Sequence, residues 1–195
     1  MQTPLRHMRL RRYYGGHPNI INPPGQESHP EWSLYGHVRP DKVHQGWDLR
    51  ASPGTDAYAV SDGRCVGVRT HDTGDYGRYI VLQFVNKATP GSGVLKIPWV
   101  DSQTFYAFYA HLDHVNIIEG QEVAAGTLIA RTGRSGNAKQ IPFNQAHLHF
   151  EIKTWATVMP EGLNHHIDPQ FFLTKPLPEP IEVHGNYKHL HGHLA

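Results

Sequence analysis

Two short motifs hold most of the residues that could bind a metal ion. HQGWD contains His44 and Asp48, and HLH contains His147 and His149. Two neutral imidazoles and one carboxylate form a zinc-binding set that leaves one coordination position for water, which is typical of catalytic sites and not of closed structural ones. The motifs therefore predict a hydrolytic metal centre.

The spacing within each motif places these side chains on common faces. HLHFEIK alternates between polar and apolar residues, so both histidines share one face of a strand while the apolar residues can be buried on the other. His44 and Asp48 are four positions apart and face the same side of either a strand or a helix. A fourth protein ligand would occupy the position that water needs, so one of His147 and His149 is expected to be free for proton transfer.

The elements that position these residues are predicted to be mostly strands. Glycine (19) and proline (15) are frequent, and no long stretch repeats apolar residues at helical spacing. Strands are expected at 58–60, 65–68, 79–85, 104–112, 122–123, 128–131 and across HLHFEIK, with a short helix at 170–173. The long connection 86–103 is interpreted as one wall of a substrate groove, with an ordinary surface loop as the alternative.

The chain length of 195 residues fits one domain with a real core. Residues 1–33 are expected to form an extended arm, residues 34–174 the catalytic domain, and residues 175–195 a loosely ordered tail. The sequence shows no recognisable secretory signal and no stretch approaching the roughly 20 apolar residues of a membrane span.

Composition argues against a nucleic acid partner. Lysine and arginine number 18 against 17 aspartate and glutamate, a formal charge of +1 that supplies no broad basic field. The lone Cys65 excludes an internal disulfide, so stability depends on the core and on a metal ion.

A further histidine, His111, closes the predicted strand 104–112. Strict alternation places it on the same face as Tyr109, from which it could reach the metal pocket on a neighbouring strand. Near a zinc ion, one imidazole can move a proton from water to the leaving amine, and a second can hydrogen-bond the negative oxygen of the tetrahedral intermediate. The alternative for His111 is packing at the edge of the core, and packing is also expected of Tyr109.

Six landmarks occur along residues 34–172 in a characteristic order. They are HQGWDLRA (44–51), YAVSDGRCVGV (58–68), YAHL (109–112), GQEVAAGTLIARTGRSG (120–136), HLHFEI (147–152) and IDP (167–169). Together they resemble one family, the lysostaphin/LytM-type zinc metalloendopeptidases, which cut peptide cross-bridges in bacterial cell walls.

The resemblance implies that His44, Asp48 and His149 hold one zinc ion (Zn²⁺) per chain. It also implies that His111 and His147 are the two non-ligand catalytic histidines, without assigning which is the general base and which stabilises the transition state. The implied fold is a compact antiparallel β core of the duplicated hybrid motif type, with long groove-forming loops.

The function implied by the resemblance is that of a hydrolase acting on the stem peptides of peptidoglycan. Cleavage after D-alanine, as a D,D-endopeptidase, is favoured over cleavage of glycine bridges. The alternatives are a catalytically silent LytM-like scaffold that activates other cell-wall hydrolases, or a structural module that holds no zinc. Action in the periplasm or at the cell wall, without a visible signal, suggests an antibacterial toxin delivered by a contact-dependent secretion system, with an immunity protein that occupies the groove.

Overall fold

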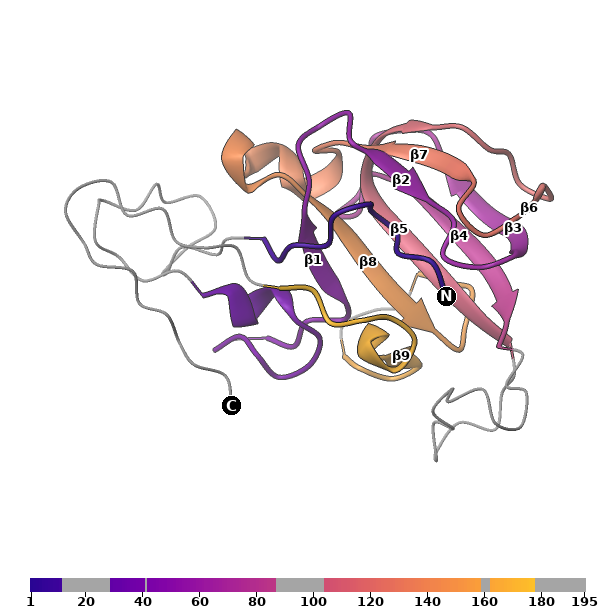
Figure 1. The fold of residues 1–195 in the computed structure, drawn as a ribbon. Helices are drawn as coiled ribbons and strands as arrows, with labels where there is room; N and C mark the ends of the chain where they lie inside the picture. Colours follow the sequence, from indigo (N-terminus) through magenta and orange to yellow (C-terminus); the bar gives the residue numbers. More distant parts are fainter. Residues whose placement is uncertain (12–28, 41, 87–103, 159–161, 178–195) are drawn as a thin grey trace.

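The computed structural model describes residues 1–11, 29–40, 42–86, 104–158 and 162–177 (Figure 1). Within these residues the chain forms nine strands and four short 3-10 helices. The strands are β1 (Trp47–Arg50), β2 (Asp56–Tyr58), β3 (Gly63–Arg69), β4 (Arg78–Val85), β5 (Thr104–Val115), β6 (Glu122–Val123), β7 (Leu128–Thr132), β8 (His147–Lys153) and β9 (His166–Ile167). The 3-10 helices are Pro30–Ser33, Gly136–Gln140, Phe143–Gln145 and Pro169–Phe171.

The strands form one antiparallel sheet in the order β1-β8-β5-β4-β3-β6, with β9 beside β8 and β2 beside β7. β5 connects its two parts. Residues 104–112 of β5 pair with β4 and residues 106–110 with β8, whereas from Leu112 to Val115 it pairs with β7, with a register shift between Leu112 and His114. In Figure 1, β2 and β7 lie side by side above β4 and β5. The expected mostly antiparallel β fold is confirmed.

Two predicted elements differ in detail. β2 ends at Tyr58 because the next two backbone amides bond outside the ladder: Ala59 N–H donates to Thr127 O (2.9 Å) and Val60 N–H to the Tyr109 hydroxyl (3.1 Å). The predicted helix at 170–173 is a single 3-10 turn, Pro169–Phe171, whose N-cap Asp168 accepts a hydrogen bond from Gln170 N–H. The groove loop proposed at 86–103 lies almost entirely outside the described residues, as does most of the tail.

The core lies against one face of the sheet. Alternate residues of β1, β5 and β8 point into it, including Trp47, Leu49, Tyr109, Leu148 and Phe150, none of which is more than 1% exposed. The other residues of these strands, including the HLH histidines, therefore face the opposite side. This division leaves a polar face on β1 and β8 on which a site can be built.

The N-terminal segment extends the sheet beyond β1. Arg50 N–H donates to Arg9 O and Arg11 N–H to Asp48 O, both at 2.8 Å, and Leu10 bridges Leu49 in antiparallel fashion. Leu10 is 3% exposed. None of the helices in the described part of the chain is long and apolar enough to cross a membrane.

Candidate metal centre

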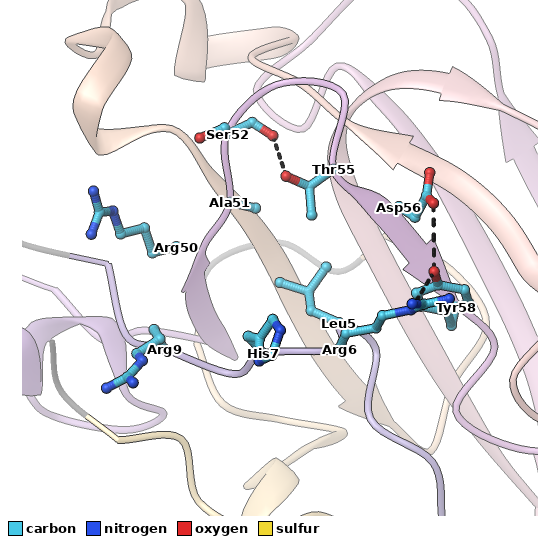
Figure 2. A pocket seen from close by; sticks show the side chains of 10 residues that line it. All are labelled: Leu5, Arg6, His7, Arg9, Arg50, Ala51, Ser52, Thr55, Asp56 and Tyr58. Atoms are coloured by element: carbon cyan, nitrogen blue, oxygen red, sulfur yellow. Dashed lines mark hydrogen bonds between the residues drawn. The ribbon is translucent and has the colours of Figure 1, made fainter.

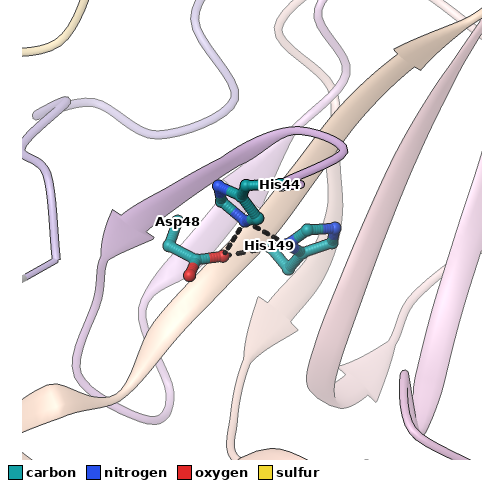
Figure 3. Close-up of side chains that lie close together, drawn as sticks. All are labelled: His44, Asp48 and His149. Atoms are coloured by element: carbon teal, nitrogen blue, oxygen red, sulfur yellow. Dashed lines mark hydrogen bonds and ion pairs between the residues drawn. The ribbon is translucent and has the colours of Figure 1, made fainter. Parts of the chain in front are cut away.

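The structure brings His44, Asp48 and His149 together (Figure 3). Asp48 Oδ1 lies 2.8 Å from His149 Nδ1 and 3.1 Å from His44 Nε2, and the two nitrogens are 3.4 Å apart. All three residues are at least nine-tenths buried. Two nitrogens and one oxygen in this cluster match the donor set of a catalytic zinc site, so the residues present fit that ion.

Strand register and one glycine create this convergence. Asp48 in β1 is directly opposite His149 in β8, so their side chains share a face. His44 precedes β1 and is held by paired backbone hydrogen bonds with Gly36. Between them, Gly46 passes so close to the Phe150 carbonyl that any Cβ would collide with it. A side chain at position 46 would push His44 away from β8.

His147 and His111 lie beside this cluster. His147 Nε2 is 3.6 Å from Asp48 Oδ1, and the His111 ring lies 5.0 Å from the His147 ring and 6.0 Å from the His149 ring, centroid to centroid. Both residues are at most 5% exposed. All five residues predicted from the sequence therefore gather in one place.

His111 reaches the site by a different route from the one predicted. Strict alternation would point it into the core with Tyr109, and Tyr109 is indeed a core residue. At His111 the backbone adopts φ 60°, uncommon for a residue other than glycine, and Leu112 then returns to the core. This local bulge turns His111 to the opposite face, toward His147. The prediction that His111 shares a face with Tyr109 was wrong. His111 nevertheless lies beside the His44–Asp48–His149 cluster, which is where it was predicted to lie.

The hydrogen bonds of the four rings define where their lone pairs point. His44, His111 and His147 each direct Nδ1 at a backbone carbonyl, at 2.7, 2.9 and 3.1 Å. A carbonyl oxygen only accepts, so each Nδ1 carries the hydrogen and each Nε2 keeps its lone pair. In His149 the positions are exchanged: Nε2 faces a carboxylate and Nδ1 faces the cluster. Every ring thus turns an unprotonated nitrogen inward when it is neutral.

A buried carboxylate supports His149 from behind. Glu151 Oε1 accepts from His149 Nε2 at 2.8 Å, and Glu151 is 1% exposed. Its other oxygen lies 3.3 Å from His166 Nε2 and 3.5 Å from Lys153 Nζ. Burial by itself would raise the pKa of Glu151, but the bonds from His149 and His166 and the charge of Lys153 hold it below its usual range. Glu151 is therefore a carboxylate at neutral pH.

Positive groups support Asp48 instead. Its Oδ2 accepts from Arg39 at 2.8 Å and lies 3.5 Å from Arg11 Nη1, and Arg11 also donates to Gln145 Oε1 at 3.2 Å. Burial would raise the pKa of Asp48, but the charge that His44 and His147 acquire in acid, together with hydrogen bonds from His149 and His44, holds it well below the usual value. Oδ2 is thus engaged by arginine while Oδ1 faces the histidines.

Burial and neighbouring charges lower the pKa of some of these histidines and raise that of another. Burial is the largest influence on the pKa of His111 and His147, lowering that of His111 to about 4 and that of His147 well below its usual value. Burial would also lower the pKa of His149, but its hydrogen bonds to Asp48 and Glu151 raise it to about 9. At neutral pH, His111 and His147 are therefore neutral proton acceptors.

Sequence reasoning missed several residues of this site. They are Arg11, Arg39, Tyr76, Gln145 and Glu151, the last of which the alternation of HLHFEIK placed on the histidine face without a role. The Tyr76 hydroxyl donates to Gln45 Oε1 at 2.7 Å, and its ring lies 5.5 Å from that of His149. No motif marked the arginines or Tyr76; Arg11 and Tyr76 come from segments distant in sequence, and Arg39 lies nine residues before Asp48 outside any motif.

Comparisons with known proteins agree with this geometry. Residues 42–169 match the model of peptidase family M23, which covers more than half of the chain. The chain therefore belongs to peptidase family M23, and the resemblance to lysostaphin/LytM-type peptidases is confirmed.

Individual relatives are more distant. The chain is 28% identical over 109 residues to the peptidoglycan DD-endopeptidase ShyB of Vibrio cholerae, a match that covers 56% of this chain and 20% of that protein. It is 27% identical over 140 residues to outer membrane antigenic lipoprotein B of Haemophilus influenzae, covering 69% and 29%. The chain thus spans less than a third of the length of these relatives.

Two solved structures share the fold. The antimicrobial peptidase lysostaphin from Staphylococcus simulans superposes with a TM-score of 0.50 at 25% identity, covering 72% of this chain and 47% of that chain. A mutant catalytic domain of the prophage-encoded M23 protein EnpA from Enterococcus faecalis gives a TM-score of 0.51 at 22% identity, covering 72% and 88%. The latter likeness concerns the fold alone.

Proposed function

We propose that this chain is a zinc-dependent endopeptidase that hydrolyses peptide cross-links of bacterial peptidoglycan. The observation that carries the proposal is the common orientation of four buried imidazoles, each with its outer N–H fixed by an acceptor and its other ring nitrogen turned toward one small volume. His44, Asp48 and His149 would hold the ion, which when bound would polarise a peptide carbonyl and acidify water.

His111 and His147 would move protons during hydrolysis. Each has an unprotonated Nε2 at neutral pH, and the bond from Nδ1 to a backbone carbonyl keeps the ring oriented. One ring takes the proton of the attacking water at Nε2 and passes it to the leaving amine. The other stabilises the developing oxyanion only in its doubly protonated form, because its Nε2 must then donate a hydrogen bond. Neither ring needs to be a ligand, since two nitrogens and one oxygen already complete the protein's share of the site.

The substrate assignment is supported by the family and by one relative. ShyB is named a peptidoglycan DD-endopeptidase, which favours cleavage after D-alanine in directly cross-linked stems. Glycine bridges are the second candidate bond. The silent scaffold is the less favoured alternative, because this chain keeps all five histidine and aspartate residues that the chemistry needs.

The test is digestion of purified, cross-linked muropeptides, followed by mass spectrometry. We expect one zinc ion per chain, cleavage of the cross-link and loss of cleavage with a chelator. His111→Ala and His147→Ala should keep zinc and lose turnover. His114→Ala, an exposed histidine on the same strand, should change neither. Cleavage that survives complete metal removal would contradict a metallopeptidase, and stoichiometric zinc without any cleavage would favour the scaffold.

The cellular context is a separate part of the proposal. If the chain is an antibacterial effector that acts on the wall, its expression in the periplasm should lyse cells, whereas cytoplasmic expression should not. An immunity protein that occupies the groove should prevent lysis and should compete with muropeptides for binding. Equal toxicity from both compartments would point away from a wall target.

A further inference from the structure

The N-terminal segment (residues 1–11) runs beside β1, and Figure 2 shows the pocket that it lines together with β2 and the turn that precedes it. The end of the segment pairs with β1. Leu10 bridges Leu49, a core residue, and Arg11 N–H donates to Asp48 O at 2.8 Å. Because paired residues on neighbouring strands share a face, this register places Arg11 on the face of Asp48.

The side chain of Arg11 bridges two parts of the metal centre. Its Nη1 lies 3.5 Å from Asp48 Oδ2, and its Nη2 donates to Gln145 Oε1 at 3.2 Å. Arg11 and Gln145 are each 3% exposed, so the bridge is shielded from water. A guanidinium group presents its donors in a fixed planar fork. Arg11 therefore holds the proposed ligand on β1 and the segment before β8 at a defined separation.

Gln145 carries the hydrogen bond that orients His147. The backbone carbonyl of Gln145 accepts from His147 Nδ1–H at 3.1 Å. Gln145 ends the 3-10 turn Phe143–Gln145, and the turn has its own backbone hydrogen bonds of 2.9 and 3.1 Å. The turn can therefore form without the Arg11 side chain. The bond from Arg11 fixes where the last residue of the turn lies, and with it the acceptor that His147 uses.

Asp48 has a second cationic partner. Arg39 Nη2 donates to Asp48 Oδ2 at 2.8 Å, a shorter contact than the 3.5 Å to Arg11. Without the Arg11 side chain, Asp48 would still be held by Arg39, whereas the buried amide of Gln145 would lose a charged donor. The expected consequence is a shift of the His147 ring relative to the metal ligands, and not loss of the metal.

We propose that Arg11 is a positioning residue for peptide hydrolysis: by bridging Asp48 and Gln145, it fixes the imidazole of His147 relative to the metal ligands. A misplacement of about 1 Å can lower a reaction rate about a hundredfold. The N-terminal segment is then a working part of the catalytic site. This role rests on the proposed peptidase function, and it adds to it the residue that sets the geometry between the proton-accepting ring and the ligands.

The first experiment measures cleavage of cross-linked muropeptides by the zinc-loaded full chain. Arg11→Met should lower kcat about 10- to 100-fold, with stoichiometric zinc and a KM within about twofold of the wild type. The variant should fold, because the main-chain bonds of Arg11 to Asp48 and Ser33 do not involve its side chain. Arg11→Lys restores the charge without the two-point contact, so its kcat should stay low. Arg9→Met, at an exposed position of the same segment, should match the wild type.

The other end of the bridge supplies a second variant. Gln145→Met removes the side-chain acceptor of Arg11 but keeps the backbone carbonyl to which His147 donates. It should lower kcat as much as Arg11→Met does. The double variant Arg11→Met/Gln145→Met should be no slower than either single variant, because all three lack the same bridge.

A second measurement does not depend on turnover. NMR follows the exchange of the His147 Nδ1–H proton with water in the zinc-loaded protein. Arg11→Met and Gln145→Met should each accelerate this exchange by about tenfold or more, because the bond to the Gln145 carbonyl opens more often. The Nδ1–H proton of His111, which donates to Ser135 O at 2.9 Å, is the internal reference and should exchange as in the wild type.

Any of four results would overturn the proposal. They are loss of zinc from Arg11→Met, wild-type turnover in Arg11→Lys, effects on kcat that multiply in the double variant, and exchange of the His147 proton that Arg11→Met leaves unchanged. If the zinc-loaded wild type cleaves no muropeptide, the proposed function fails. The exchange of the His147 proton then still decides whether Arg11 positions this ring.

Discussion

Asp48 and His149, the proposed metal ligands paired across β1 and β8, are supported by opposite charges. Behind His149 lies the carboxylate of Glu151, whereas behind Asp48 lie the guanidinium groups of Arg39 and Arg11. A carboxylate that accepts from a ligand histidine makes the ring a stronger donor and fixes its tautomer. A guanidinium engages one carboxylate oxygen and leaves the other to face the ion.

The opposite supports show that two things are set separately: where Asp48 and His149 lie, and how strongly each binds a cation. Backbone register fixes where Asp48 and His149 lie. The side chains behind them decide how strongly each binds a cation. Negative charge from Glu151 attracts a cation in addition to orienting His149, so its two effects add. The arginines orient Asp48 while repelling a cation, so their two effects oppose each other.

Removing the carboxylate behind His149 should have the largest effect. Lys153 is fully buried, its Nζ donates to Thr157 O at 3.0 Å, and Glu151 is the carboxylate that lies 3.5 Å from it. Glu151→Leu leaves this ammonium without its counter-charge, so we expect a loss of about 3–5 kcal/mol in the free energy of unfolding. Urea denaturation of the metal-free protein measures it. Glu122→Leu, at an exposed position, is the control, and a loss as small as the control's would show that Glu151 is not a needed partner.

The pH dependence of the stability of the metal-free protein follows from the two carboxylates that contact His149. Asp48 and Glu151 raise the pKa of His149 from 6.5 to about 9. The folded state therefore binds this proton more tightly than the unfolded state. The stabilisation is fully present below pH 6.5 and is lost as the pH rises through about 9.

The size of this pH effect is up to about 3 kcal/mol, from 1.36 kcal/mol per pKa unit. Denaturation curves of the metal-free protein across this range measure it, and His149→Gln should flatten the profile. Zinc binding at Nδ1 must displace the same proton, so apparent zinc affinity should increase with pH over this range. An apo protein that gained stability between pH 6.5 and 9 would contradict the raised pKa.

A milder change isolates the charge of Glu151 from its shape. Glu151→Gln keeps an oxygen that can accept from His149 Nε2 but removes the negative charge. Zinc affinity should decrease by about 10- to 100-fold, the usual cost of losing a partner behind a metal ligand. Competition with a chromogenic chelator measures it, with Glu122→Gln as the matched control. Affinity within twofold of the control would mean that the charge behind His149 is unimportant.

The sequence predicted the strands and the histidine faces where alternation was strict. HLHFEIK forms β8, with Leu148, Phe150 and Ile152 in the core, because a period of two is enough to define which side is buried. His111 shows where this reasoning ends. A single residue at φ 60° reverses its face, and no composition signal marks a bulge at a non-glycine position.

The support of Asp48 was also beyond sequence reasoning, for a different reason. Arg11 and Arg39 lie 37 and 9 residues before Asp48, and they meet it through the N-terminal segment and the stretch before β1. Ion pairs between residues that share no helix or strand have no periodicity by which the sequence could mark them. The position of Glu151 could be predicted, because it follows His149 by two residues on the same strand, although its role could not.

The smallest expected effect tests the arginine support of Asp48. Arg39→Met removes the 2.8 Å hydrogen bond to Asp48 Oδ2. The loss of this bond disorders the Asp48 carboxylate and lowers zinc affinity, whereas the loss of a positive charge near the ion raises it. Because these effects oppose each other, zinc affinity should change by less than about tenfold, well below the loss in Glu151→Gln. Turnover should fall more than affinity does, since Asp48 can then turn its second oxygen toward the ion. Arg64→Met is the control, and a loss of affinity that equals or exceeds that of Glu151→Gln would mean that orientation, and not charge, determines how strongly each ligand binds.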